Sequence, residues 1–152
     1  FDFMKGLHSN INQYTKSGSA PIKAAGRGET TIGIVFMHDA VKQAVKGFPV
    51  KVVAPAEGTG YEIGSMSIID GARNMKEAKA FYDWALSADA QNLALEVNAF
   101  QVPSNTGAKT SESAPDMSSI KLIDYDFKTY GSSATRKRLL KKWDDEVSVL
   151  AQ

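Results

Sequence analysis

The chain has 152 residues, of which 43% are hydrophobic, with 18 basic and 17 acidic side chains and no cysteine. This length and hydrophobic content suffice for one compact domain with a real core. A net charge of +1 gives no electrostatic reason to expect nucleic-acid binding. The lack of cysteine excludes thiol catalysis, thiolate metal sites and disulfides.

The first segment predicts a helix that the chain enters in progress. Phe3, Leu7, Ile11 and Tyr14 recur at helical spacing from the very first residues. A tag or a disordered tail would be polar instead. We therefore expect an upstream portion of the protein to precede Phe1.

A turn rich in hydroxyl groups follows at residues 15–21. Ser17 and Ser19 flank a glycine just before an expected helix start. Hydroxyls and free backbone N–H groups at such a place suit an oxyanion, yet they also suit an ordinary helix N-cap. The turn lacks the Gly-Lys pair and the spacing of a nucleotide P-loop, so nucleotide binding is not inferred.

Strand-like and helical patterns then alternate along the middle of the chain. β-Branched content and flanking prolines predict strands at residues 30–36, 49–55 and 65–69. Apolar periodicity predicts helices at residues 22–25, 41–46, 75–86 and 89–97. The first of these helices is expected to end at Gly26 and Gly28, and the second at Gly47. This alternation predicts the α/β fold class.

The C-terminal third predicts a surface crossing and a final helix. Residues 104–119 are rich in Ser, Thr, Asn, Gly and Pro, as is typical of a long loop. Residues 134–150 carry leucine, valine and tryptophan at helical spacing, and Ser132 or Ser133 can cap this helix. The basic residues 136–138 are interpreted as its solvated face.

Three polar residues in the middle of the chain are candidate ligand contacts. His38 and Asp39 follow the first predicted strand, where α/β sheets place ligands. They are interpreted as an acid–base pair, as part of a metal site, or as hydrogen-bonding groups for a polyol or phosphate, while Asp39 also suits a helix cap. Glu62 follows a glycine-rich turn and is either a crevice carboxylate or a solvated charge.

The pattern does not favour catalysis or a resident metal. His38, Asp39 and Glu62 form a conceivable metal trio, but the chain has only two histidines and no zinc-motif spacing. There is no Gly-x-Ser-x-Gly elbow, and His8 has no acidic neighbour in sequence. We therefore predict a receptor for a small polar anion, with no catalytic residue and no cofactor.

Several motifs together resemble one family. They are Gln13 to Pro21, Ile32-Gly33-Ile34 before His38-Asp39, Ser65 to Asn74, Ala80 to Leu86, and Gln101 to Asn105. In this combination the chain resembles the C-terminal half of a periplasmic substrate-binding protein of an ABC importer, in the ferric-iron and sugar-phosphate receptor group. The resemblance covers nearly the whole chain.

The resemblance implies a type II fold with two α/β lobes and the ligand in the cleft between them. It implies that residues 1–62 belong to the second lobe, that 63–105 return to the first, and that 106–152 form a crossing and the C-terminal docking helix of the second. The N-terminal half of the receptor would lie upstream of this chain. Its partners would be membrane permease subunits, and its location periplasmic, or extracytoplasmic and membrane-anchored in a Gram-positive bacterium.

The resemblance also bears on the ligand. Ferric-iron members use adjacent tyrosines after the strand, whereas this chain has Met37-His38-Asp39 there, which suits a hard ferric ion less well. With Glu62, the pair instead resembles receptors of phosphorylated sugars. Asp39 and Glu62 would accept from sugar hydroxyls, His38 would donate, and Ser17 and Ser19 would position the anion. A ferric-iron receptor and a His/Asp-dependent hydrolase are the alternatives.

Overall fold

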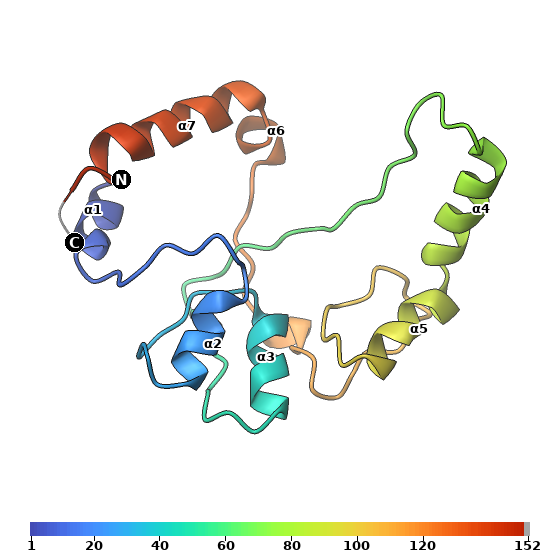
Figure 1. The fold of residues 1–152 in the computed structure, drawn as a ribbon, viewed down its shortest axis with the longest axis horizontal. Helices are drawn as coiled ribbons and strands as arrows, with labels where there is room; N and C mark the ends of the chain where they lie inside the picture. Colours follow the sequence, from blue (N-terminus) through green and yellow to red (C-terminus); the bar gives the residue numbers. More distant parts are fainter. Residues whose placement is uncertain (151–152) are drawn as a thin grey trace. The chain divides into compact units, whose positions relative to one another are not determined.

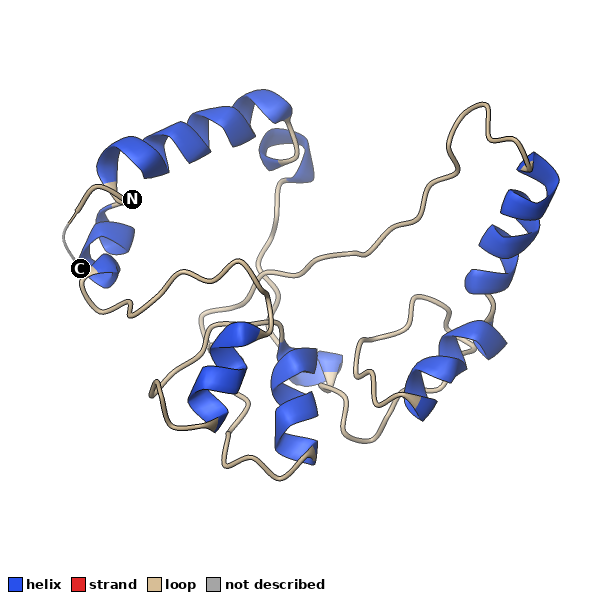
Figure 2. Ribbon diagram, in the orientation of Figure 1, coloured by secondary structure: helices blue, strands red, loops and turns tan. Residues whose placement is uncertain are grey.

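The computed structural model describes residues 1–150, which form helices joined by long irregular segments (Figures 1 and 2). The chain divides into two compact units. One combines Phe1–Ser17 with the C-terminal segment that starts at Ile123, and the other is Gly18–Leu122. The lobe boundaries expected at residues 62 and 105 stay predictions. In the described part of the chain, no helix has the length and apolar character needed to span a membrane.

Most of the helices lie where the sequence predicts them. In chain order they are α1 (Asp2–His8), α2 (Ala20–Gly26), α3 (Met37–Val45), α4 (Met75–Ala85), α5 (Ala88–Glu96), the 3-10 turn η1 (Met117–Ser119), α6 (Phe127–Tyr130) and α7 (Ser133–Glu146). The predicted glycine stop after α3 is confirmed, because Gly47 adopts a positive φ of 85°. The predicted cap of α7 is confirmed too, since the Ser132 hydroxyl accepts the Thr135 N–H.

The prediction that the opening helix continues to Tyr14 is wrong, because α1 ends at His8. The hydroxyl of Ser9 donates to the carbonyl of Gly6 at 3.2 Å, and the amide of Asn10 donates to the same carbonyl at 3.4 Å. Short polar side chains that bond to nearby backbone groups compete with helix continuation. The chain therefore leaves the helix just after His8.

The three predicted strands do not form, and Figure 2 shows helices and loops only among the described residues. A strand needs a neighbouring strand to satisfy its backbone groups. The one isolated bridge in residues 1–150 is a parallel contact between Thr59 and Leu122, where the N–H of Thr59 donates to the carbonyl of Lys121 at 3.0 Å. Ile32 and Ile34 of the first predicted strand are 77% and 75% exposed. The α/β class is therefore not confirmed in this chain by itself.

Helices α2 and α3 pack side by side in the second unit (Figure 1). Ile22 on α2 is buried, and so are Ala40 and Val41 on α3. Gly33, in the segment between the two helices, lies so close to α2 that a Cβ there would come within 2.7 Å of the Pro21 carbonyl oxygen. The glycine therefore permits a close backbone approach that no other residue allows.

Side-chain amides fasten the predicted surface crossing onto α5. The side chain of Gln91 donates to the Ser104 hydroxyl at 2.9 Å and accepts the Asn105 N–H at 3.0 Å. Asn92 accepts the N–H of Lys109 at 2.7 Å, and the amide of Asn105 donates to the Leu86 carbonyl at 2.8 Å. The beginning of the crossing is thus tied to the helices before it.

Apolar side chains of α4 and α5 remain exposed, among them Phe81, Trp84 and Leu93. By contrast, the buried apolar side chains of the described residues form a short list: Ile22, Ala40, Val41, Phe100 and Val147. Since burial of apolar surface is the main favourable term in folding, so small a core leaves the chain weakly stabilised.

We predict that the isolated 152-residue chain binds the apolar dye ANS and unfolds without a sharp transition, because its exposed apolar patches lack a cover. Dye fluorescence and near-ultraviolet circular dichroism during heating test this, with a single-domain protein of similar length that unfolds cooperatively as control. A monomeric isolated chain that melts cooperatively and binds no dye would contradict the prediction.

We further predict that Gly33→Ala, tested in a cooperatively folding protein that contains this chain, lowers the free energy of unfolding by about 1–3 kcal/mol, as overpacking does. The added methyl would overlap the backbone of Pro21. Denaturant titration measures the loss. Gly6→Ala is the matched control, because a Cβ at Gly6 meets nothing within 4 Å; equal effects of the two substitutions would count against the close approach.

Candidate ligand-binding site

His38 and Asp39 lie in the first turn of α3. Phe36, whose backbone is extended (φ −65°, ψ 138°), occupies the N-cap position. Its carbonyl accepts the N–H groups of Asp39 at 3.1 Å and Ala40 at 3.3 Å. The alternative interpretation of Asp39 as the cap is therefore wrong, because the helix begins two residues earlier and has no side-chain cap.

The His38 and Asp39 side chains are close but not hydrogen-bonded to each other. Nε2 of His38 lies 3.9 Å from Oδ2 of Asp39, which exceeds hydrogen-bond distance. The side chains are 29% and 25% exposed. In residues 1–150 neither makes a side-chain hydrogen bond within the chain, so both keep their polar atoms available for an external partner.

The imidazole of His38 also has an aromatic neighbour. The ring of Phe36 stacks on the imidazole of His38 with a centroid distance of 5.5 Å and an interplanar angle of 15°. Both rings belong to the second unit. The candidate site thus combines an imidazole, a carboxylate and an aromatic surface at one helix start.

The serine turn lies just before α2. Ser19 occupies the N-cap position of α2, yet its side chain makes no capping hydrogen bond. The carbonyl of Ser17 accepts the hydroxyl of Thr15 at 2.9 Å, and the Ser17 side chain is exposed. The interpretation of this turn as an ordinary side-chain cap is therefore not supported at Ser19, and its hydroxyl remains available.

The structure brings some of the predicted site residues close together and leaves others apart. His38 and Asp39 are neighbours, and the close approach of Gly33 to Pro21 brings the turn at Ser19 next to the segment that leads to them. Glu62 lies in an exposed loop, and within the described chain no hydrogen bond or ion pair links it to His38 or Asp39. No group of three potential metal-ligating side chains occurs in residues 1–150. The role of Glu62 stays a prediction.

Sequence reasoning missed Phe36 and Gly33 as parts of this arrangement. A single glycine within a β-branched run is a signal of close backbone approach, and it was available at Gly33. An aromatic residue two positions before His38 gave no comparable signal, because the stack depends on where the chain changes from extended to helical.

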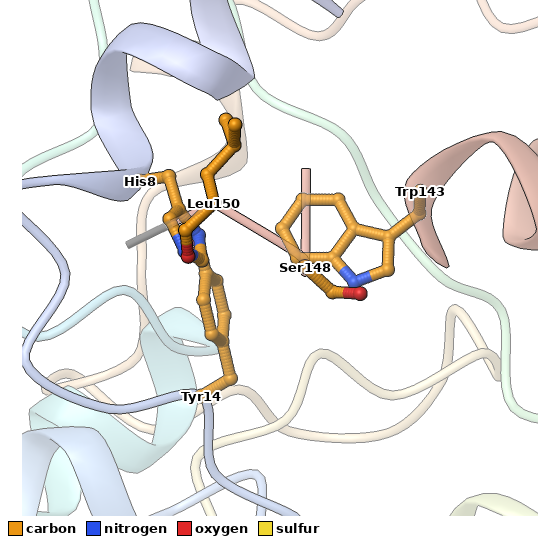
Figure 3. A pocket seen from close by; sticks show the side chains of 5 residues that line it. All are labelled: His8, Tyr14, Trp143, Ser148 and Leu150. Atoms are coloured by element: carbon orange, nitrogen blue, oxygen red, sulfur yellow. The ribbon is translucent and has the colours of Figure 1, made fainter. Parts of the chain in front are cut away.

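A second feature, in the first unit, is a surface hollow of about 510 Å³ (Figure 3). It is lined by His8, Tyr14, Trp143, Ser148 and Leu150. Nδ1 of His8 lies 3.0 Å from the Tyr14 hydroxyl, and Nε2 lies 3.1 Å from the Leu150 carbonyl oxygen. The rings of Tyr14 and Trp143 meet edge to face at 5.1 Å.

This hollow has the features of a structural cluster. His8 is only 3% exposed and uses both ring nitrogens within the chain. Buried polar groups need such partners, because a buried group without one costs about 1–3 kcal/mol. His8 has no acidic neighbour in sequence, and its partners are instead a phenol and a backbone carbonyl.

An ion pair connects the helices of the first unit. Nζ of Lys5 on α1 lies 2.7 Å from a carboxylate oxygen of Glu146 on α7. The hydrogen bond from Lys5 lowers the pKa of Glu146 below its usual value of 4.5. Because the pKa is lowered in the folded state, the stabilisation is present above pH 4.5 and is lost as the pH falls through the lowered value.

Solved structures place this chain in a class of binding proteins. The periplasmic binding protein AfuA from Actinobacillus pleuropneumoniae, solved with exogenous fructose 6-phosphate bound, is 51% identical, with a TM-score of 0.91 over 99% of this chain and 47% of its own. The periplasmic binding protein P5PA is 40% identical, with a TM-score of 0.87 over 97% of this chain and 47% of its own. The resemblance predicted from sequence is confirmed.

The family can be stated directly. Residues 1–120 match the family model for bacterial extracellular solute-binding proteins, and the chain belongs to this family. A protein of Haemophilus influenzae is 49% identical over 150 residues, which are 98% of this chain and 43% of that protein. The chain therefore spans less than half the length of these relatives. Family membership points to an extracytoplasmic location.

We predict that His8→Ala lowers the free energy of unfolding by about 1–3 kcal/mol, since both ring nitrogens serve the fold. Tyr14→Phe, which removes one of the two hydrogen bonds, should cost less. Denaturant titration measures both losses. Unchanged stability of the His8→Ala variant would count against a structural role for the hollow.

Proposed function

We propose that this chain is part of an extracytoplasmic receptor of an ABC importer that captures a phosphorylated sugar and delivers it to the membrane permease. The observation that carries the proposal is the 51% identity, over 99% of this chain, to a periplasmic binding protein solved with fructose 6-phosphate. The free polar atoms of His38 and Asp39 add support, because a sugar offers hydroxyls to both.

Each predicted site residue has a role in this proposal. Asp39 and Glu62 accept hydrogen bonds from sugar hydroxyls, and His38 donates one to a hydroxyl or phosphate oxygen. Ser17 and Ser19 help to position the phosphate. The unused hydroxyl of Ser19 supports this role, and the close approach of Gly33 to Pro21 supports a site that uses both segments.

The proposed output is a conformational state and not a chemical product. Closure of two lobes around the ligand would present a new surface to the permease. AfuA and P5PA are periplasmic binding proteins, which favours this proposal over a His/Asp-dependent hydrolase. A ferric-iron receptor is the runner-up within the same class.

We propose that the complete receptor has the type II fold with two α/β lobes. Residues 1–62 and 106–152 then contribute to the second lobe, and 63–105 to the first. An N-terminal half would supply partners for the extended segments and cover for the exposed apolar side chains. The proposed location is the periplasm, or the outer face of the membrane in a Gram-positive bacterium.

The proposal predicts that the metal-free full-length receptor binds fructose 6-phosphate or glucose 6-phosphate more tightly than inorganic phosphate. Asp39→Asn and Glu62→Gln should each weaken sugar-phosphate binding by about 10- to 100-fold, as expected for lost hydrogen bonds to a charged acceptor. Isothermal titration calorimetry measures this. Asp83→Asn, at an exposed carboxylate on α4, is the matched control and should leave affinity unchanged.

Two outcomes would overturn the proposed function, and a third would overturn only the assignment of the site. Binding of ferric citrate alone, with a visible charge-transfer band, would establish the iron alternative. Steady release of phosphate from the sugar phosphate would establish a hydrolase. Tight sugar-phosphate binding that neither substitution weakens would leave the receptor function intact and place the ligand elsewhere.

A further inference from the structure

The imidazole of His38 is held by a neighbouring ring and not by a hydrogen bond. In the described residues it stacks on the ring of Phe36, and the carboxylate of Asp39 lies 3.9 Å away. Histidines that act on a ligand usually have one ring nitrogen fixed by a hydrogen bond, which sets the plane of the ring. Here the stack is the contact that can set this plane.

The backbone makes the stack possible. Phe36 is the last extended residue before α3, and its carbonyl accepts the N–H groups of Asp39 and Ala40. Its position relative to the first helical turn is therefore fixed by two hydrogen bonds. Because His38 lies in that turn, the two rings start from a fixed backbone geometry.

Packing into a core does not account for the position of the Phe36 ring within this chain. The side chain is 48% exposed, so a large part of it makes no core contact. The nearly parallel arrangement, with 15° between the planes and 5.5 Å between the centroids, is instead that of an offset stack against the imidazole. Such aromatic pairs contribute more stabilising free energy than their buried area alone accounts for. The edge of the imidazole that carries its nitrogens stays free for hydrogen bonds.

We propose that Phe36 is a positioning residue for ligand recognition: its ring fixes the plane of the His38 imidazole so that a ring nitrogen points at a hydroxyl of a sugar phosphate. This inference rests on the proposed function. It also makes Phe36 a determinant of specificity, because the stack supports recognition of the sugar and not of the phosphate group.

Phe36→Leu tests the proposal in the full-length receptor, because leucine keeps an apolar side chain but cannot stack. We expect affinity for fructose 6-phosphate to fall about 5-fold, equivalent to about 1 kcal/mol, the range of an aromatic pair. Affinity for inorganic phosphate should not change. Phe36→Tyr keeps the ring and should retain the original affinity for both ligands.

A spectroscopic measurement separates positioning from a general loss of structure. In the unsubstituted receptor, the ring current of the stacked Phe36 should shift the carbon-bound ring protons of His38 upfield of those of free histidine. Phe36→Leu should remove this shift while the resonances of His8 stay in place, and Phe36→Tyr should retain it. The absence of an upfield shift in the unsubstituted receptor would overturn the proposal without any substitution.

His38→Ala distinguishes failure of this inference from failure of the proposed site. If His38→Ala weakens sugar-phosphate binding and Phe36→Leu does not, the histidine contacts the ligand but needs no stack, and the inference is wrong. If His38→Ala has no effect, the site assignment itself fails. Equal losses in Phe36→Leu and Phe36→Tyr would also contradict the inference, because tyrosine retains the ring.

Discussion

The candidate site depends on one close backbone contact, between Gly33 and the first turn of α2. A Cβ at position 33 would lie within 2.7 Å of the Pro21 carbonyl oxygen and 3.1 Å of the Ile22 nitrogen. Only glycine allows this approach. It fixes the extended segment against α2, and this segment leads directly to Phe36 and α3. The turn at Ser19 and the first turn of α3 are therefore positioned by the same contact.

Helices could be predicted from this sequence because their hydrogen bonds are local. The apolar periodicity of residues 75–86 and the cap at Ser132 both lie within a few residues of the bonds that they predict. Strands are different, since their backbone hydrogen bonds need a second strand, which the local sequence pattern does not identify. Residues 30–36 carry the β-branched pattern of a strand, and yet Ile32 and Ile34 are exposed and no neighbouring strand lies beside them in the described chain.

The same distinction applies to the site. His38 and Asp39 were identified as candidate ligand contacts because they follow an apolar run. They do lie together in the first turn of α3. The role of Asp39 as a cap was wrong because α3 starts at Met37, four residues before the helix predicted at 41–46. Such a shift of a helix end is beyond what a sequence pattern resolves. The stack of Phe36 on His38 was not predictable, since it requires a particular rotamer of each ring as well as the backbone bend between them.

The distance of 3.9 Å between Nε2 of His38 and Oδ2 of Asp39 bears on how the site would recognise a ligand. A short hydrogen bond between them would orient the imidazole, but it would also occupy one nitrogen and one carboxylate oxygen. Since both side chains are partly exposed, water can satisfy them when no ligand is bound, and their separation costs little. An aromatic stack orients the imidazole without occupying either nitrogen. A site built in this way keeps all of its polar atoms for the hydroxyls of a ligand, which is the requirement of a receptor that must bind and then release its cargo unchanged.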